Sequence, residues 1–264
     1  MIELKSPGEI DAMRAAGLVV AEALTAMRER AAVGVSLLEL DDVARQVLHE
    51  AGAGSSFLDY HPAFAPTPFP GVICASVNDV VVHGIPDRYR LREGDLVGLD
   101  FGAHLDGWHG DSAISFVVGR ADPRDARMIE TAERALAAGI AAAVPGARLG
   151  DVSAAVGAIA RAGGYGIPGD FGGHGIGREM HESPGVPNEG RAGRGLRLLP
   201  GMAIAIEPML HRGGGDGYYE AADGWALRTV DGSRAAHVEH SIAITEDGPV
   251  VLTARRPPAA PPRS

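Results

Sequence analysis

The sequence has only one cysteine, Cys74, among 264 residues. No disulfide bond can therefore form within the chain, and the residues after Met1 show no apolar signal segment. Long hydrophobic runs are also missing: the longest, residues 137–144, is far shorter than the roughly 20 residues that a membrane-spanning helix requires. We expect a cytoplasmic protein without a membrane-bound part.

Positive charge is scarce as well. The chain has 24 Lys and Arg residues against 34 Asp and Glu, a formal net charge of −10. This charge repels phosphate backbones and anionic membrane surfaces, so nucleic acid and membranes are not expected partners. Apolar residues, in contrast, make up 45% of the chain and suffice for a sizeable core.

The chain carries two similar pairs of predicted helices. Ser6-Pro7-Gly8-Glu9 and Ser36-Leu37-Leu38-Glu39 are capping boxes that open helices over about 6–27 and 36–51. Residues 128–144 and 151–162 predict a second pair, and a shift of 112 residues aligns several apolar and glycine positions of the two pairs. The pattern indicates an internal duplication.

Polar motifs repeat in the same order. His-Gly-Ile occurs at 83–85 and 174–176, a glycine-led apolar strand ends on a carboxylate at 93–100 and 200–207, and a carboxylate opens a strand at 111–114 and 239–242. We predict an α+β fold with two pseudo-symmetric halves around one shared site, forming a single catalytic domain over 1–256. Residues 62–70 predict an extended surface loop without chemistry, and 257–264 a flexible proline-rich tail.

Four acids occupy equivalent points of the two halves. Asp106-Gly107 predicts a type I′ hairpin turn that places Gly102 opposite Asp111, so Asp100 and Asp111 become diagonal neighbours on one face. In the second half, Glu207 ends an apolar strand and Glu239 begins the strand expected to pair with it. Any one such acid would ordinarily face water, but four together favour a metal site.

Carboxylates with an imidazole suit divalent Mn, Fe, Co or Zn, and four carboxylates favour two ions roughly 3.5–4 Å apart. His174 lies among glycines that permit close approach to a ligand, while His83 and His181 lie beside similar glycine or proline positions. The remaining motif-free histidines receive no role; they are His49, His104, His211 and His237.

The motifs resemble those of the methionine aminopeptidases, which have the pita-bread fold. The resemblance runs from about Ser6 to Leu252. It rests on Asn78-Asp79-Val80-Val81-Val82-His83-Gly84-Ile85-Pro86, Asp100-Phe101-Gly102 through Gly110-Asp111, Gly173-His174-Gly175-Ile176-Gly177-Arg178 through His181-Glu182, Ile206-Glu207-Pro208, and Glu239-His240-Ser241. The short interval between His181 and Glu207 leaves no space for the insertion of type II enzymes, so the closest resemblance is to the bacterial type I enzymes.

The resemblance implies an aminopeptidase that hydrolyses the initiator methionine from chains with a small second residue, using two divalent ions (Co, Mn, Fe or Zn). The implied metal ligands are Asp100, Asp111, His174, Glu207 and Glu239, with Asp111 and Glu239 bridging. Glu207 would act as base, His181 would donate to the carbonyl oxygen, and His83 would contact the scissile amide. The implied methionine pocket consists of Tyr60, Phe69, Cys74, Met180 and Trp225, with ordinary core packing as the alternative for each. His83 and His181 are implied as further substrate-binding residues.

Two other functions fit the same residues less well. A proline-directed peptidase would share the fold and the metal ligands, but such enzymes resemble a longer chain with a further N-terminal domain. A non-catalytic binding scaffold would be expected to lose ligands. The expected partners are the N-termini of nascent polypeptides and Met-peptides, with a transient ribosome contact and a monomeric protein.

Overall fold

The structure is a computed structural model that describes residues 2–63 and 65–255. The predicted tail, 257–264, and the predicted domain end at residue 256 lie outside this part. The four helices found within it are α1 (Pro7–Arg30), α2 (Leu37–Ala51), α3 (Pro123–Ala142) and α4 (Leu149–Ala162). The strands are β1 (Gly54–Ser55), β2 (Cys74–Val77), β3 (Val80–Val82), β4 (Leu96–Leu105), β5 (Trp108–Val117), β6 (Gly172–Gly175), β7 (Glu182–Pro187), β8 (Ala203–Ile206), β9 (Met209–His211), β10 (Tyr218–Glu220), β11 (Leu227–Thr229), β12 (Ala235–His237), β13 (His240–Thr245) and β14 (Gly248–Val251).

The predicted helix starts are largely confirmed. The Ser6 and Ser36 capping boxes are formed, and Gly52 ends α2 in the left-handed conformation. Helix α3 begins at Pro123, earlier than the predicted Met128, because the side chain of Asp122 caps the N–H of Arg124 and proline favours the first helical position. No described helix combines the length and the apolar character needed to cross a bilayer.

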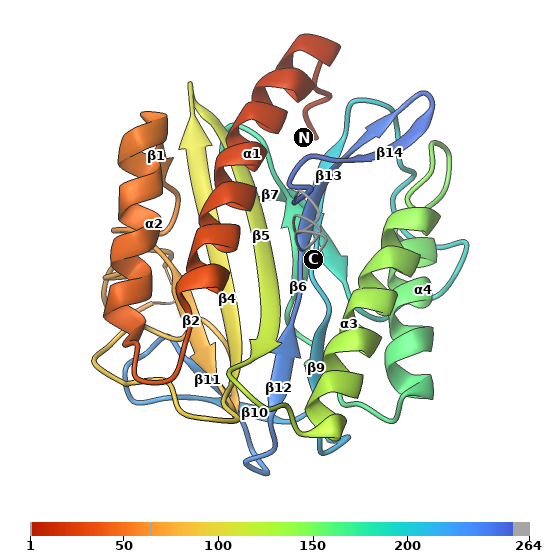
Figure 1. Cartoon of the computed structure of the whole chain (residues 1–264). Helices are drawn as coiled ribbons and strands as arrows, with labels where there is room; N and C mark the ends of the chain where they lie inside the picture. The colour runs from red at the N-terminus through yellow and green to blue at the C-terminus, as the bar shows by residue number, and fades with distance from the viewer. Residues whose placement is uncertain (1, 64, 256–264) are drawn as a thin grey trace, which may run out of the picture.

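The two predicted halves are present as two sheets, each covered by its own helix pair. The first sheet has the order β1-β4-β2 with β5 beside β4, and the second has the order β14-β13-β8-β6-β7. Helices α1 and α2 lie over the first sheet and α3 and α4 over the second, all on the same face of the molecule (Figure 1). Each half fills its own apolar core, so the α+β prediction and the pseudo-symmetry are confirmed.

Serine hydroxyls join the two halves where β5 passes residues 237–241. Ser112 Oγ donates to the carbonyl of Glu239 at 2.6 Å, and Ser241 Oγ donates to the carbonyl of Asp111 at 2.7 Å. The N–H of Asp111 in turn donates to Ser241 Oγ at 3.1 Å. Because these bonds involve the backbones of Asp111 and Glu239, the seam fixes one acid of each half relative to the other.

The loop at 62–70 differs from its prediction. Ala65 and Phe69 are buried, and the carbonyl of Thr67 accepts a hydrogen bond from Nε1 of Trp225 at 3.0 Å. Backbone bonds from Asp59 to Phe69 and from Phe69 to Tyr60 close the loop at its base. Ala65 and Phe69 therefore point into the molecule, whereas Pro66, Pro68 and Pro70 are exposed, so the prediction of a surface loop holds for only part of this segment.

Candidate active site

The β4–β5 hairpin places the two aspartates as the sequence predicts. Asp106 and Gly107 both have positive φ, 51° and 76°, and the register pairs Gly102 with Asp111. Asp100, two residues from Gly102, therefore lies diagonal to Asp111 on the same face. In the second half, β8 pairs with β13 through Ile206 and His240, which brings the adjacent residues Glu207 and Glu239 to the same end of the sheet.

These carboxylates lie in an environment that disfavours their negative charge. Asp111 and Glu239 are 4% and 2% exposed. Among the described residues, no hydrogen bond reaches Asp100 Oδ1, Asp111 Oδ1 or Glu239 Oε1. Burial, followed by repulsion from Asp111, raises the pKa of Asp100 and of Glu239 well above the ordinary values, and burial raises the pKa of Asp111 to about 6. A cation is what would satisfy such a group of oxygens.

His174 completes this group with a nitrogen. Its Nδ1 lies 2.8 Å from the carbonyl oxygen of Gly175, which can only accept, so Nδ1 carries the proton and Nε2 presents a lone pair. Nε2 lies 3.9 Å from Asp111 Oδ2 and 3.9 Å from Glu207 Oε1. Donors that converge in this way fit a divalent transition-metal ion.

Among the described residues, two sets of donors are close enough to hold an ion, and they share one residue. Asp111, His174 and Glu239 form the first set, and Glu207, His237 and Glu239 form the second; within each set the donor atoms lie within 4.8 Å of one another. His237, to which the sequence assigned no role, thus lies in the site. The feature of the sequence that could have identified His237 is its position two residues before Glu239.

Two further imidazoles face the cavity without joining these sets. Burial lowers the pKa of His83 to about 4, and burial followed by the neighbouring His174 lowers the pKa of His181 to about 3. Both rings are therefore neutral at pH 7. Nδ1 of His181 lies 3.0 Å from the hydroxyl oxygen of Tyr60. The His83 ring packs edge-on against Trp225, with ring centres 6.3 Å apart.

Glu207 has a neighbour on each side. Burial alone would raise the pKa of Glu207, but His237 and His174 hold the pKa of this carboxyl below its ordinary value. Oε2 lies 3.2 Å from Nε2 of His237, while Oε1 faces His174. Glu207 therefore remains ionised at neutral pH, unlike Asp100 and Glu239, whose pKa values are raised well above the ordinary range.

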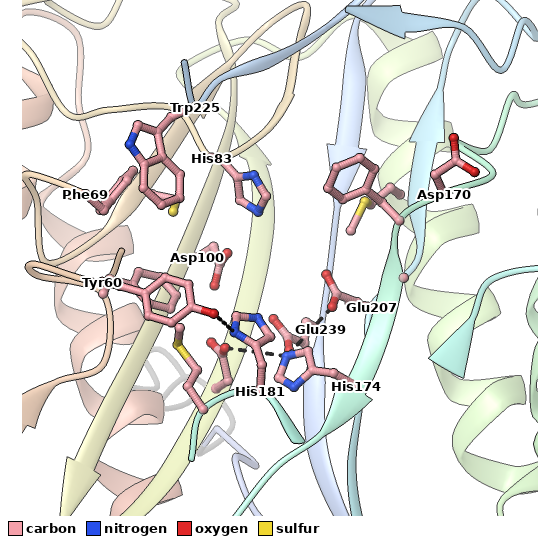
Figure 2. Close-up of a pocket in the computed structure, with 17 residues that line it drawn as sticks. Tyr60, Phe69, His83, Asp100, Asp170, His174, His181, Glu207, Trp225 and Glu239 are labelled. Carbon is pink, nitrogen blue, oxygen red and sulfur yellow. Dashed lines mark hydrogen bonds and ion pairs between the residues drawn. The ribbon is translucent and has the colours of Figure 1, made fainter. Parts of the chain in front are cut away.

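The acids and imidazoles line a cavity of about 360 Å³ whose opposite wall is apolar. Figure 2 shows Tyr60, Phe69 and Trp225 on that wall, and His174, Glu207 and Glu239 across from them. The structure brings all the sequence-predicted residues to this one cavity: Tyr60, Phe69, Cys74, His83, Asp100, Asp111, His174, Met180, His181, Glu207, Trp225 and Glu239. The sequence missed Phe57, Asp170, Phe171 and Met209, which no motif marks.

Comparison with known proteins gives consistent matches. The model of metallopeptidase family M24 matches residues 11–246. Methionine aminopeptidase 1 of Mycobacterium tuberculosis is 50% identical over 260 residues, covering 96% of this chain and 95% of that protein. Methionine aminopeptidase of Aquifex aeolicus is 43% identical, covering 96% of this chain and 98% of that protein.

Solved structures agree with these matches. The methionine aminopeptidase of Thermotoga maritima superimposes with a TM-score of 0.92 at 38% identity, covering 97% of this chain and all of that one. The prolidase of Pyrococcus furiosus has a TM-score of 0.77 at 22% identity, and the match covers 96% of this chain but 66% of the prolidase. The prolidase likeness shows the fold alone.

Proposed function

This chain belongs to metallopeptidase family M24, and we propose that its cavity is the active site of a bacterial type I methionine aminopeptidase. The reaction is hydrolysis of the first peptide bond, which releases the N-terminal methionine of proteins and peptides whose second residue is small. The observation that carries this proposal is the meeting of buried carboxylates and neutral imidazoles with an apolar wall in one cavity. Near-full-length relatives named methionine aminopeptidase support it.

We assign metal binding to Asp100, Asp111, His174, Glu207 and Glu239, and two divalent ions (Co, Mn, Fe or Zn) to the site. Three of these residues bury a carboxylate oxygen without a protein partner, and Glu239 is shared by both donor sets. When bound, such ions lower the pKa of a water molecule and polarise a carbonyl group. Glu239 is therefore proposed as a bridging ligand, with Asp111 beside it.

The remaining polar groups have roles that follow from their protonation. The carboxylate of Glu207 is ionised at neutral pH, so it accepts a proton from the attacking water. His181 is neutral, and with Nδ1 accepting from the Tyr60 hydroxyl, its Nε2–H is free to donate to the substrate's carbonyl oxygen as negative charge develops there. His83 contacts the nitrogen of the scissile amide.

The apolar wall suits a methionine side chain. Phe57, Phe69, Cys74, Met180 and Trp225 form one buried cluster, with the ring of Tyr60 packed against it. A flexible thioether packs well against aromatic rings and sulfur atoms. Burial raises the pKa of the Cys74 thiol well above its usual range, so Cys74 contributes an uncharged, weakly polar surface to this pocket.

A proline-directed peptidase is the less favoured function. The prolidase match is 22% identical and the chain spans 66% of that protein, whereas methionine aminopeptidases match along nearly their whole length. The scaffold hypothesis is weaker still, because all five proposed ligands line the cavity.

The deciding experiment is a metal-reconstituted assay of Met-Ala-Ser, Ala-Ala-Ser and Ala-Pro. We expect cleavage of Met-Ala-Ser alone. Preferred cleavage of Ala-Pro would establish the proline-directed peptidase, and no cleavage of any peptide by protein shown to contain metal would favour the scaffold.

We further propose that the enzyme acts in the cytoplasm as a monomer on the N-termini of nascent chains and of Met-peptides, with a transient ribosome contact. The net charge of −10 and the single buried cysteine support this setting. Co-sedimentation with translating ribosomes and the mass in solution test the contact and the monomer separately.

A further inference from the structure

His237 is a buried imidazole at the site that has no part in the roles assigned above. Its side chain is 4% exposed, and its Nε2 lies 3.2 Å from Oε2 of Glu207. Within the part of the chain that the structure describes, this nitrogen has no hydrogen-bond partner, and the carboxylate of Glu207 is its ion-pair neighbour. A buried ring nitrogen next to a buried carboxylate has to interact with it or lose its hydration uncompensated.

The charge of Glu207 determines which form of the ring is stable. A neutral imidazole carries a proton on one nitrogen and a lone pair on the other. A lone pair on Nε2 would face the negative oxygen of Glu207 at 3.2 Å, whereas an N–H at this nitrogen would be attracted to it. Nε2 of His237 therefore carries the proton, and a nitrogen that donates in this way is not available as a metal ligand.

The backbone of His237 is held firmly enough for a positioning role. Ser115 Oγ accepts from the N–H of His237 at 3.0 Å and donates to its carbonyl at 2.8 Å. On the other side, His237 pairs with Met209 in the β12–β9 ladder. The Ser115 hydroxyl of the first half and strand β9 of the second thus fix the position of the His237 backbone, from which the ring extends.

The two oxygens of Glu207 then have separate surroundings. Oε2 faces His237 at 3.2 Å, and Oε1 lies 3.9 Å from Nε2 of His174, whose lone pair points into the donor cluster. We propose that His237 is a positioning residue that holds Oε2 of Glu207 through its Nε2–H and thereby presents Oε1 to a metal ion. The inference rests on the metal binding assigned under the proposed function.

The competing interpretation makes His237 a direct ligand, since its ring nitrogen and the oxygens of Glu207 and Glu239 lie within 4.8 Å of one another. The two interpretations differ in what can replace the ring. Glutamine keeps an N–H donor and is a poor ligand for transition metals, whereas leucine keeps neither property.

The test is titration of the metal-free full-length protein with Mn²⁺ by calorimetry, using wild type, His237→Gln and His237→Leu. We expect His237→Leu to weaken one class of Mn²⁺ site by roughly 10- to 100-fold, the usual effect of losing a partner that orients a ligand. His237→Gln should stay within about threefold of wild type, because a donor to Oε2 remains. The visible spectrum of the Co²⁺ form should be alike in wild type and His237→Gln.

His211→Leu is the matched control. His211 is a fully buried imidazole of the neighbouring strand β9, bonded to the carbonyl of Gly215, and it does not line the cavity. The His211→Leu variant should bind Mn²⁺ as wild type does. If His237→Leu does not fold, judged by thermal melting, His237→Met takes its place, because Mn²⁺ does not favour thioether ligands.

The outcomes separate the inference from the proposed function. Wild-type protein that binds no Mn²⁺ would overturn the assigned metal site itself. If wild type binds Mn²⁺ and His237→Leu binds it equally well, the positioning role is wrong. If His237→Gln weakens binding as much as His237→Leu and alters the Co²⁺ spectrum, His237 is a direct ligand and the positioning role is again wrong.

Discussion

Asp100 and Asp111 lie diagonally on one face of the β4–β5 hairpin, and each buries an Oδ1 atom that no hydrogen bond reaches among the described residues. After burial, the neighbouring Asp111 is the largest cause of the raised pKa of Asp100, whereas the pKa of Asp111 is raised mainly by its own burial. Their contributions to metal binding should nevertheless differ. Asp111 belongs to a donor set with His174 and Glu239, whereas Asp100 belongs to neither set.

Substitution of Asp100, Asp111 and Glu239, one at a time, should therefore give different metal contents. Asp111→Asn and Glu239→Gln should each lose both ions, because these residues are the proposed bridges, and Asp100→Asn should mainly weaken one. Elemental analysis after dialysis against limiting Mn²⁺ measures this. Equal metal content in all three variants would contradict the bridging assignment.

Chelation should abolish activity in the wild type, and Co²⁺ or Mn²⁺ should restore it.

Metal binding should release protons and strengthen as pH rises. The metal-free protein keeps Asp111 protonated below about pH 6, and the pKa values of Asp100 and Glu239 are raised well above ordinary values, so a cation competes with protons at pH 7. Affinity should fall between pH 7 and pH 5, by up to about tenfold per pH unit for each proton displaced. Calorimetry in buffers of different ionisation enthalpy counts the protons; a count of zero at pH 6 would refute this mechanism.

Loss of His181 should affect turnover rather than metal content. His181→Ala should lower kcat by roughly 10²–10³, the effect of losing one oxyanion donor, with little change in KM. A hydrogen bond that forms mainly to the developing negative charge is worth more in the transition state than in the bound substrate. A variant that loses an ion would show that His181 is a ligand, and a variant with unchanged turnover would show that it does not act in the reaction.

Tyr60→Phe should have a smaller effect of the same kind. The Tyr60 hydroxyl lies 3.0 Å from Nδ1 of His181, and in the proposed mechanism it donates there, which keeps the proton of His181 on Nε2. Losing one such neutral hydrogen bond costs about 1 kcal/mol, which lowers kcat roughly fivefold. Because phenylalanine keeps the ring that packs against the pocket, KM for Met-Ala-Ser should change little. A large rise in KM with unchanged kcat would instead assign Tyr60 to methionine binding alone.

Asp125 should be important for stability without affecting the site. This acid in the first turn of α3 is 0% exposed and pairs with Arg212 at 2.6 Å and also with Arg234. Asp125→Ala should lower the free energy of unfolding by about 3 kcal/mol, because two guanidinium groups lose their partner. Urea denaturation measures this. The exposed control Asp11→Asn in α1 should change it by about 0.5 kcal/mol or less.

Local sequence rules predicted the parts of this molecule that local physics determines. Capping residues marked the starts of α1 and α2, and Asp106-Gly107 determined the register that brings Asp100 beside Asp111. The spacing of two residues between His237 and Glu239 was a local signal, but this spacing does not place the His237 ring beside Glu207. That placement depends on the approach of two segments distant in sequence, with Ser115 bonding to the backbone of residue 237, and no periodic pattern records such a contact.

The local sequence around Phe69 does not indicate its burial for a related reason, and only the family resemblance placed this residue in the pocket. Prolines on both sides favour an extended surface segment, whereas the burial of Phe69 and the hydrogen bond from Trp225 to Thr67 depend on residues far apart in the chain. The pocket residues Phe57 and Met209 likewise resemble ordinary core residues until the two halves are placed together.

The serine-joined seam bears on how the protein would respond to repeated removal of its metal. Asp111 and Glu239 are fixed by hydrogen bonds of Ser112 and Ser241 to their backbones, and none of these bonds uses a carboxylate oxygen. The backbone around Asp111 and Glu239 is thus ordered without an ion, so metal binding has to order little of the chain and costs little conformational entropy. Stripping and reloading should therefore be a fast, reversible exchange without hysteresis, in contrast to small zinc domains that unfold when their ion leaves.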